Sequence, residues 1–188
     1  DYVQRMPDGS LRKGGVWWGG QCYLVNPTAS LQLARRNLPE IKKLFPLNYY
    51  YIDTTFAVPL SEDFNPLNPM DRNEDVRRKQ AMCKFARDLF GLFGSEEGVE
   101  WGVPVADYAE SMLFQRTKRQ SGEVLAPLFE MVYGDCFVIC EGDRTLPATP
   151  EYVLDHLICA EMPQAIFNKA IGCDLSCRIA GAEFISDT

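Results

Sequence analysis

Three short apolar runs in the sequence are each followed by a carboxyl side chain that could take part in catalysis. Asp53 follows Tyr-Tyr-Tyr-Ile, and the adjacent acids Glu96 and Glu97 follow Leu-Phe-Gly-Ser. Asp135 follows Met-Val-Tyr-Gly. If these runs are strands of a parallel sheet, the acids lie at the carboxyl ends of the strands, where the active sites of α/β barrels are found.

Two carboxyl groups that face one bond are what glycoside hydrolysis requires. One group protonates the leaving oxygen, and the other attacks the anomeric carbon or activates a water molecule. One βα unit with a long loop fits between Asp53 and Glu96, so we expect these acids on adjacent strands, facing each other across a cleft. Each acid can equally be a cap or a turn former, and Asp135 in particular suits a structural hydrogen-bond acceptor.

The strands that would position these acids alternate along the chain with amphipathic stretches, which predicts βα units. We expect strands at 48–53, at about 91–96 and at 126–139, the last being the strongest strand signal in the sequence. Residues 16–25 read as a glycine-interrupted strand, and residues 103–115 are ambiguous.

Helices are predicted between these strands. Apolar residues at helical spacing indicate a helix over 31–45, with Pro39 either interrupting it or opening a second helix at its first turn. Asp71 or Asn73 can cap the next helix, because both side chains accept hydrogen bonds from free backbone amides. A further helix starts near Pro150, since proline is pre-organised for the first helical position.

Residues 54–72 form a long loop with three prolines, and loops of this length in compact domains are often functional. We expect it to cover the cleft on the strand-end side, with Phe56 or Phe64 near a bound sugar. Aromatic residues make up 12% of the chain, and their flat rings suit sugar stacking and core packing equally. The aromatic candidates for substrate binding are Trp18, Tyr51, Phe56 and Trp101.

Charge and hydropathy exclude two classes of partner. The net charge is −7, which disfavours nucleic acid, and the basic cluster of Arg116, Lys118 and Arg119 is too short to change this expectation. No apolar run approaches the roughly 20 residues that a membrane-spanning helix needs. We therefore expect neither nucleic acid nor membrane as a partner, while the pair of acids favours a carbohydrate substrate.

Cysteine and histidine usage argues against a cofactor. The seven cysteines are too sparse for a disulfide framework, and the single histidine, His156, makes a histidine-rich zinc site implausible. Oxygen ligands for calcium could come from Glu62, Asp63 and Asn65, although a solvated acidic loop explains these residues as well. We therefore predict no cofactor, with calcium as the open alternative.

Four motifs in sequence order resemble a set of glycosidase barrels. They are Tyr51-Ile-Asp53-Thr-Thr, Asn68-Pro-Met-Asp-Arg72, Phe93-Gly-Ser-Glu96-Glu-Gly98 and Pro127-Leu-Phe-Glu-Met-Val-Tyr-Gly-Asp135. Their order and spacing are similar to those of the endo-α-N-acetylgalactosaminidases of glycoside hydrolase families 101 and 129 and of related bacterial barrels. The resemblance is strongest over residues 15–140.

This resemblance implies a (β/α)₈ TIM-type α/β fold and roles for the acids. A strand-end Asp is the nucleophile in those enzymes and a Glu on the next strand is the acid/base, so Asp53 and Glu96 take these roles here, with Glu97 as the rival acid. Gly134 stands where related barrels often have histidine, which puts a substrate contact from Asp135 in doubt. Residues 1–188 are expected to form a single catalytic domain, an incomplete barrel with both ends cut.

The function that these expectations favour is retaining hydrolysis of an α-linked O-glycosidic bond. The alternative is a non-catalytic carbohydrate-binding barrel, which needs aromatic rings and hydrogen-bonding groups but no convergent acids. A metal-dependent hydrolase on the same fold is disfavoured by the single histidine. The sugar, the oligomeric state and the compartment receive no prediction.

Overall fold

The computed structural model describes residues 2–110, 128–136 and 138–140. Contacts within the chain group these residues into two compact units. Residues 2–50 and 58–93 form unit 1, while residues 51–57 and the described residues from 94 onward belong to unit 2. The elements in chain order are β1 (Lys13–Trp17), β2 (Gly20–Tyr23), α1 (Pro27–Leu44), β3 (Tyr49–Tyr51), α2 (Arg72–Phe90), β4 (Leu92–Glu96), the 3-10 turn η1 (Val103–Val105), β5 (Tyr108–Glu110), α3 (Leu128–Tyr133) and β6 (Val138–Cys140).

The four strands β3 to β6 form one sheet in the order β3-β4-β5-β6. β4 pairs in parallel with β5, and β5 pairs in parallel with β6. The amide of Leu92 donates to the carbonyl of Asn48, and the amide of Ile52 donates to the carbonyl of Gly94. Both strands advance in the same direction between these two hydrogen bonds, so β3 and β4 are also parallel. The predicted parallel neighbours at 48–53 and 91–96 are confirmed.

The predicted strand at 126–139 is wrong over most of its length. Residues Leu128–Tyr133 form α3, and Val138–Cys140 form β6. A short apolar run does not distinguish a strand from a buried helical turn by periodicity, and Leu, Glu and Met within this run favour a helix. The strand between β4 and β6 is instead β5, which lies in the stretch whose sequence was ambiguous.

Several predicted features lie outside the described residues. They are the helix expected near Pro150, the basic cluster of Arg116, Lys118 and Arg119, and His156. Among the helices that the structure does describe, none combines the length and the apolar character that crossing a bilayer would require.

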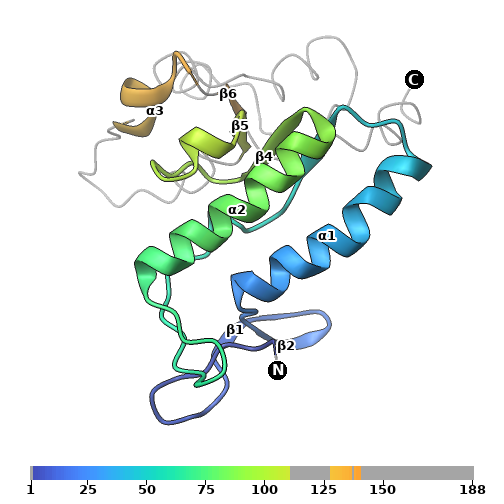
Figure 1. Cartoon of the computed structure of the whole chain (residues 1–188). Coiled ribbons are helices and arrows are strands. Elements are labelled where there is room, and N and C mark those ends of the chain that lie inside the picture. The colour runs from blue at the N-terminus through green and yellow to red at the C-terminus, as the bar shows by residue number, and fades with distance from the viewer. Residues whose placement is uncertain (1, 111–127, 137, 141–188) are drawn as a thin grey trace. The chain divides into compact units, whose positions relative to one another are not determined.

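Unit 1 is built on two long helices that pack side by side (Figure 1). α1 is capped by Asn26, whose side chain accepts from the amide of Thr28, and Pro27 occupies its first turn. The helix continues through Pro39, so neither the predicted interruption nor a second helix is present. Arg35, whose carbonyl loses its helical donor at Pro39, is exposed to solvent.

α2 confirms the predicted helix after the long loop. Asp71 is the N-cap, with its carboxylate accepting from the amide of Glu74, and Gly91 ends the helix with φ 107°. Phe90 lies on the buried face and stacks on Tyr50, with 4.5 Å between ring centroids. The other buried residues of α2 share that helical face and are Asp75, Lys79, Met82, Cys83 and Ala86.

The glycine-interrupted segment at 16–25 is a hairpin instead of one strand. β1 and β2 pair antiparallel, with Trp17 opposite Gly20. Trp18 lies in the turn between the two strands and is fully exposed. The reason is local, since Gly19 and Gly20 supply a turn, and Gly20 has φ 105°.

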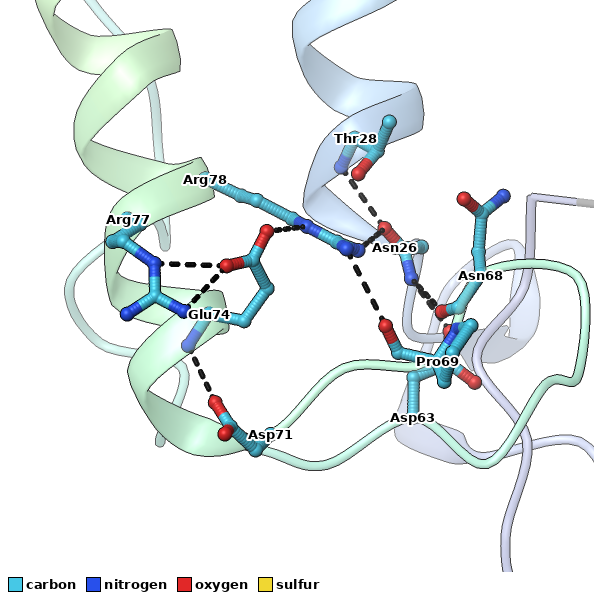
Figure 2. Close-up of polar contacts among 9 residues, drawn as sticks. All are labelled: Asn26, Thr28, Asp63, Asn68, Pro69, Asp71, Glu74, Arg77 and Arg78. Carbon is cyan, nitrogen blue, oxygen red and sulfur yellow. Dashed lines mark hydrogen bonds and ion pairs between the residues drawn. The ribbon is translucent and has the colours of Figure 1, made fainter.

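Asn26 joins the start of α1 to the loop before α2 and to α2 itself (Figure 2). Its amide nitrogen donates to Asp63 Oδ2 at 2.6 Å and to the carbonyl of Asn68 at 3.2 Å. Its oxygen accepts from the Thr28 amide and from Arg78 Nη1. The side chain is buried, so every one of these bonds replaces a bond to water.

We expect Asn26→Asp to destabilise the protein by about 2 kcal/mol at neutral pH, because it places a carboxylate against Asp63 and removes two buried bonds. Two carboxyl groups that share one site raise the pKa of one of them in the folded state, so part of the loss should be recovered as the pH falls. Asn26→Ala is the control without this pH dependence. Urea unfolding at pH 7 and pH 5 measures both, and a pH-independent loss for Asn26→Asp would contradict this assignment.

Candidate active site

Asp53 lies where the chain leaves β3. Ile52 separates β3 from the turn at residues 53–57, and Asp53 is exposed. The Tyr51 hydroxyl donates to Asp53 Oδ1 at 3.3 Å.

Glu96 is the last residue of β4 and is half-buried. The three residues before it, Phe93, Gly94 and Ser95, are buried, which is typical of a parallel strand covered on both faces. Because β3 and β4 are parallel, Asp53 and Glu96 follow strand ends at the same edge of the sheet. The structure therefore places these two predicted acids at neighbouring strand ends.

The backbone turns sharply immediately after each of these acids. Thr54 has φ 59° and Glu97 also has φ 59°, and no other non-glycine residue in the described ranges has a positive φ. This left-handed conformation costs roughly 1–2 kcal/mol for a residue with a Cβ, and more for a β-branched residue such as Thr54. Strain of this kind gathers at functional sites, where the surrounding structure compensates for it.

Glu97 differs from Glu96 in its environment. The strand ends at Glu96, so the alternation of side chains along a strand does not extend to Glu97. Partial burial raises the pKa of the Glu97 carboxyl above its ordinary value. A raised pKa suits a proton donor, and Glu97 therefore stays the rival of Glu96 for the role of acid.

Gly94 lets a ring of the next strand lie against β4. Gly94 is in register with Tyr108 of β5, and a Cβ at this position would lie 2.0 Å from Cε1 of the Tyr108 ring. The Tyr108 ring in turn lies 6.1 Å from that of Tyr51. Packing of the Tyr108 ring thus requires a glycine before Ser95. The same ring lies beside Tyr51, whose hydroxyl donates to Asp53.

Two predicted aromatic site residues contact each other. Phe56 and Trp101 pack edge to face with 5.2 Å between ring centroids, and Gly102 leaves room for Phe56. Phe56 is only 3% exposed, so it has no open ring face for a sugar in this structure. Its role here is to anchor the turn that carries Asp53, while Trp101 is half-buried. Trp18 belongs to the hairpin of unit 1.

Asp135 does not follow a strand, contrary to the sequence prediction. It lies in the turn between α3 and β6 and precedes β6. In a parallel sheet this is the edge opposite the ends of β3 and β4. The error follows from the misassigned strand at 126–139, and Asp135 does not join Asp53 and Glu96 at their edge.

Ser95 is a residue at this site that the sequence analysis missed. Its side chain is completely buried, and its hydroxyl donates to the carbonyl of Ile52 at 2.7 Å. The same oxygen accepts from the amide of Phe56 at 3.4 Å. Its place directly before Glu96 was the only signal, because the contact joins segments far apart in sequence.

The acidic segment considered for calcium lies in unit 1. Asp63 Oδ1 accepts from the amides of Arg5 and Asn65, and Asp63 Oδ2 accepts from Asn26. These bonds give the carboxylate a structural role. Across residues 2–110, 128–136 and 138–140, no three His, Cys, Asp or Glu side chains are grouped to hold a metal ion. The absence of a cofactor stays a prediction, with calcium as its alternative.

Comparison with known proteins identifies the protein family of this chain. Residues 3–124 match the family described as glycosyl hydrolases related to GH101 family, GH129. The chain is similar to the α-N-acetylgalactosaminidase NagBb from Bifidobacterium bifidum in its GalNAc complex, with 25% identity and a TM-score of 0.66, over 74% of this chain and 23% of that one. The ligand-free form of NagBb is 23% identical with a TM-score of 0.74, and the match covers 85% of this chain and 27% of that one. A quadruple mutant of NagBb is 20% identical with a TM-score of 0.76, and the match covers 100% of this chain and 38% of that one. A comparison with curated proteins finds no match.

The parallel sheet and the likeness to these solved structures, which this chain covers only in part, are those of an incomplete (β/α)₈ barrel. The chain belongs to family GH129, since the family match covers more than half of it. It spans less than two fifths of the length of the solved structures that it matches.

We expect Glu97→Gln to raise the melting temperature at neutral pH. The folded state raises the pKa of Glu97, so its contribution to stability is complete below the ordinary value of 4.5 and is lost as the pH rises through the folded value. The gain should therefore shrink below about pH 4.5. Thermal melting at pH 7 and pH 4 measures it, with exposed Glu100→Gln as the control. Equal shifts at both pH values would argue against burial as the cause.

Proposed function

We propose that this chain carries the catalytic acids of a retaining glycosidase that cleaves an α-linked O-glycosidic bond. Asp53 is the nucleophile and Glu96 is the acid/base. The observation that carries the proposal is the parallel pairing of β3 with β4, which brings Asp53 and Glu96 to neighbouring strand ends at one edge of the sheet. Membership of a glycoside hydrolase family supports it.

The reaction proceeds in two steps at these residues. The Asp53 carboxylate attacks the anomeric carbon and forms an ester bond, the glycosidic C–O bond breaks, and the proton of Glu96 moves to the leaving oxygen. In the second step the Glu96 carboxylate takes a proton from water, and the water oxygen bonds to the anomeric carbon. The ester bond to Asp53 then breaks and the carboxylate returns. This route requires the two carboxyl groups to lie roughly 5–5.5 Å apart.

The surroundings of the two acids suit this division of roles. The Tyr51 hydroxyl donates to the Asp53 carboxylate, and this bond orients the group that attacks. Glu96 is half-buried and the adjacent Glu97 supplies a second carboxyl group.

The solved relatives support a proposal for the substrate class. NagBb is an α-N-acetylgalactosaminidase and one of its structures holds GalNAc. We infer that the full-length gene product acts on terminal α-linked N-acetylgalactosamine, and para-nitrophenyl α-N-acetylgalactosaminide is the probe. Absence of any turnover of this and other aryl α-glycosides by the full-length gene product would refute the proposal.

We expect Asp53→Asn to lower turnover of the aryl glycoside by at least about 10³-fold, because an amide is no nucleophile. Sugar binding should remain measurable by calorimetry, since the amide keeps the shape of the side chain. Tyr51→Phe is a milder companion variant, which removes only the hydroxyl donor. Retention of near wild-type turnover by Asp53→Asn would remove it from the mechanism.

We expect Glu96→Gln to slow substrates with poor leaving groups by about 10²–10⁴-fold and activated aryl glycosides far less, because activated groups need little protonation. Glu97→Gln is the matched control, one residue away with the same change in chemistry. Steady-state rates over a series of leaving groups give the comparison. If the selective loss appears in Glu97→Gln instead, the acid is Glu97.

A further inference from the structure

The Ser95 hydroxyl forms a bridge between β4 and the turn that carries Asp53. It donates to the Ile52 carbonyl at 2.7 Å and accepts from the Phe56 amide at 3.4 Å. Ile52 precedes Asp53 and Phe56 follows it by three residues. One side chain therefore contacts the backbone on both sides of Asp53, and that side chain belongs to the residue before Glu96.

Burial makes this bridge consequential. Ser95 is completely buried, and a hydroxyl in such a place gains its stability only from protein partners. Both of its partners are backbone groups of the turn around Asp53. Alanine would fill nearly the same volume, so core packing alone does not require a hydroxyl at this position.

The bridged turn also contains the strained residue. Thr54 adopts φ 59° between the two groups that Ser95 bonds. Without an anchor, a β-branched residue would relax toward an ordinary conformation, and Asp53 would move with it. Phe56 adds a second anchor, because its buried ring packs on Trp101 next to the amide that Ser95 accepts from.

We propose that Ser95 is a positioning residue that holds the Asp53 turn at a fixed distance from Glu96. This inference rests on the proposed function, because it assigns the distance between these two acids to one hydroxyl. Ser95 touches neither acid in the contacts described above and acts through the backbone of Ile52 and Phe56. It sets where the nucleophile stands and leaves the proton transfer by Glu96 unchanged.

The test uses the full-length gene product and steady-state kinetics on leaving groups of different reactivity. Ser95→Ala should lower kcat by on the order of 10- to 100-fold, because a displacement of about 1 Å at a reacting group can cost about 10²-fold. KM should change much less than kcat. The loss should be equal for activated and poor leaving groups, because both need the nucleophile, whereas Glu96→Gln discriminates between them.

Ser61→Ala is the matched control. Ser61 is a buried serine of unit 1 whose hydroxyl contacts Gln4 Oε1 at 2.9 Å and Asp75 Oδ2 at 3.4 Å. The Ser61→Ala variant loses a comparable number of buried hydrogen bonds. Its melting temperature should therefore fall as much as that of Ser95→Ala, while its kcat stays unchanged. Ser95→Cys keeps a weak donor in a somewhat larger side chain, and its kcat should lie between those of wild type and Ser95→Ala.

The outcomes separate the two proposals. A wild-type protein that hydrolyses no aryl α-glycoside refutes the proposed function. With an active wild type, an unchanged kcat in Ser95→Ala refutes the role of Ser95 alone. A loss confined to poor leaving groups would show that Ser95 acts on Glu96, and an equal loss in Ser61→Ala would reduce the effect to stability. Either result overturns the inference.

Discussion

The parallel pairing of β3 with β4 is the constraint on which the candidate site depends. The Leu92 amide reaches the Asn48 carbonyl and the Ile52 amide reaches the Gly94 carbonyl, so both strands end at the same edge. The positions of Asp53 and Glu96 follow from this pairing, because each residue lies at or just after the end of its strand. Shifting the pairing by one residue would turn every side chain of β4 to the other face and would remove Ser95 from the Asp53 turn.

Two strained residues and their anchors accompany this register. Thr54 and Glu97 each adopt a left-handed backbone directly after a candidate acid, and this conformation costs roughly 1–2 kcal/mol for each residue. The Ser95 bridge and the packing of Phe56 on Trp101 hold the first of these turns. In unit 1, the buried bonds of Asn26 similarly hold the loop before α2 against α1. In both places a buried side chain holds a loop by a hydrogen bond to the backbone of a segment that is distant in sequence.

Local signals were sufficient to predict the elements that carry the acids. The cap Asp71, the stop at Gly91 and the apolar runs at 48–53 and 91–96 predicted α2, β3 and β4, and each is present. The hairpin at 13–23, the helix α3 and the three-residue strand β5 were missed, because short apolar runs do not reveal which partner will pair with them. Ser95 and Thr54 were missed for a related reason. A contact between residues 52 and 95 and a positive φ at a threonine are imposed by tertiary structure and leave no trace in local composition.

Covalent trapping tests the central claim most directly. A fluorinated, activated α-glycoside that glycosylates the nucleophile of a retaining glycosidase should label the full-length gene product once per active site. Peptide mapping by mass spectrometry should then find the sugar as an ester on Asp53, and Glu96→Gln should still be labelled because an activated leaving group needs little protonation. An ester on Glu96, Glu97 or any other residue would contradict the assignment of Asp53 as nucleophile.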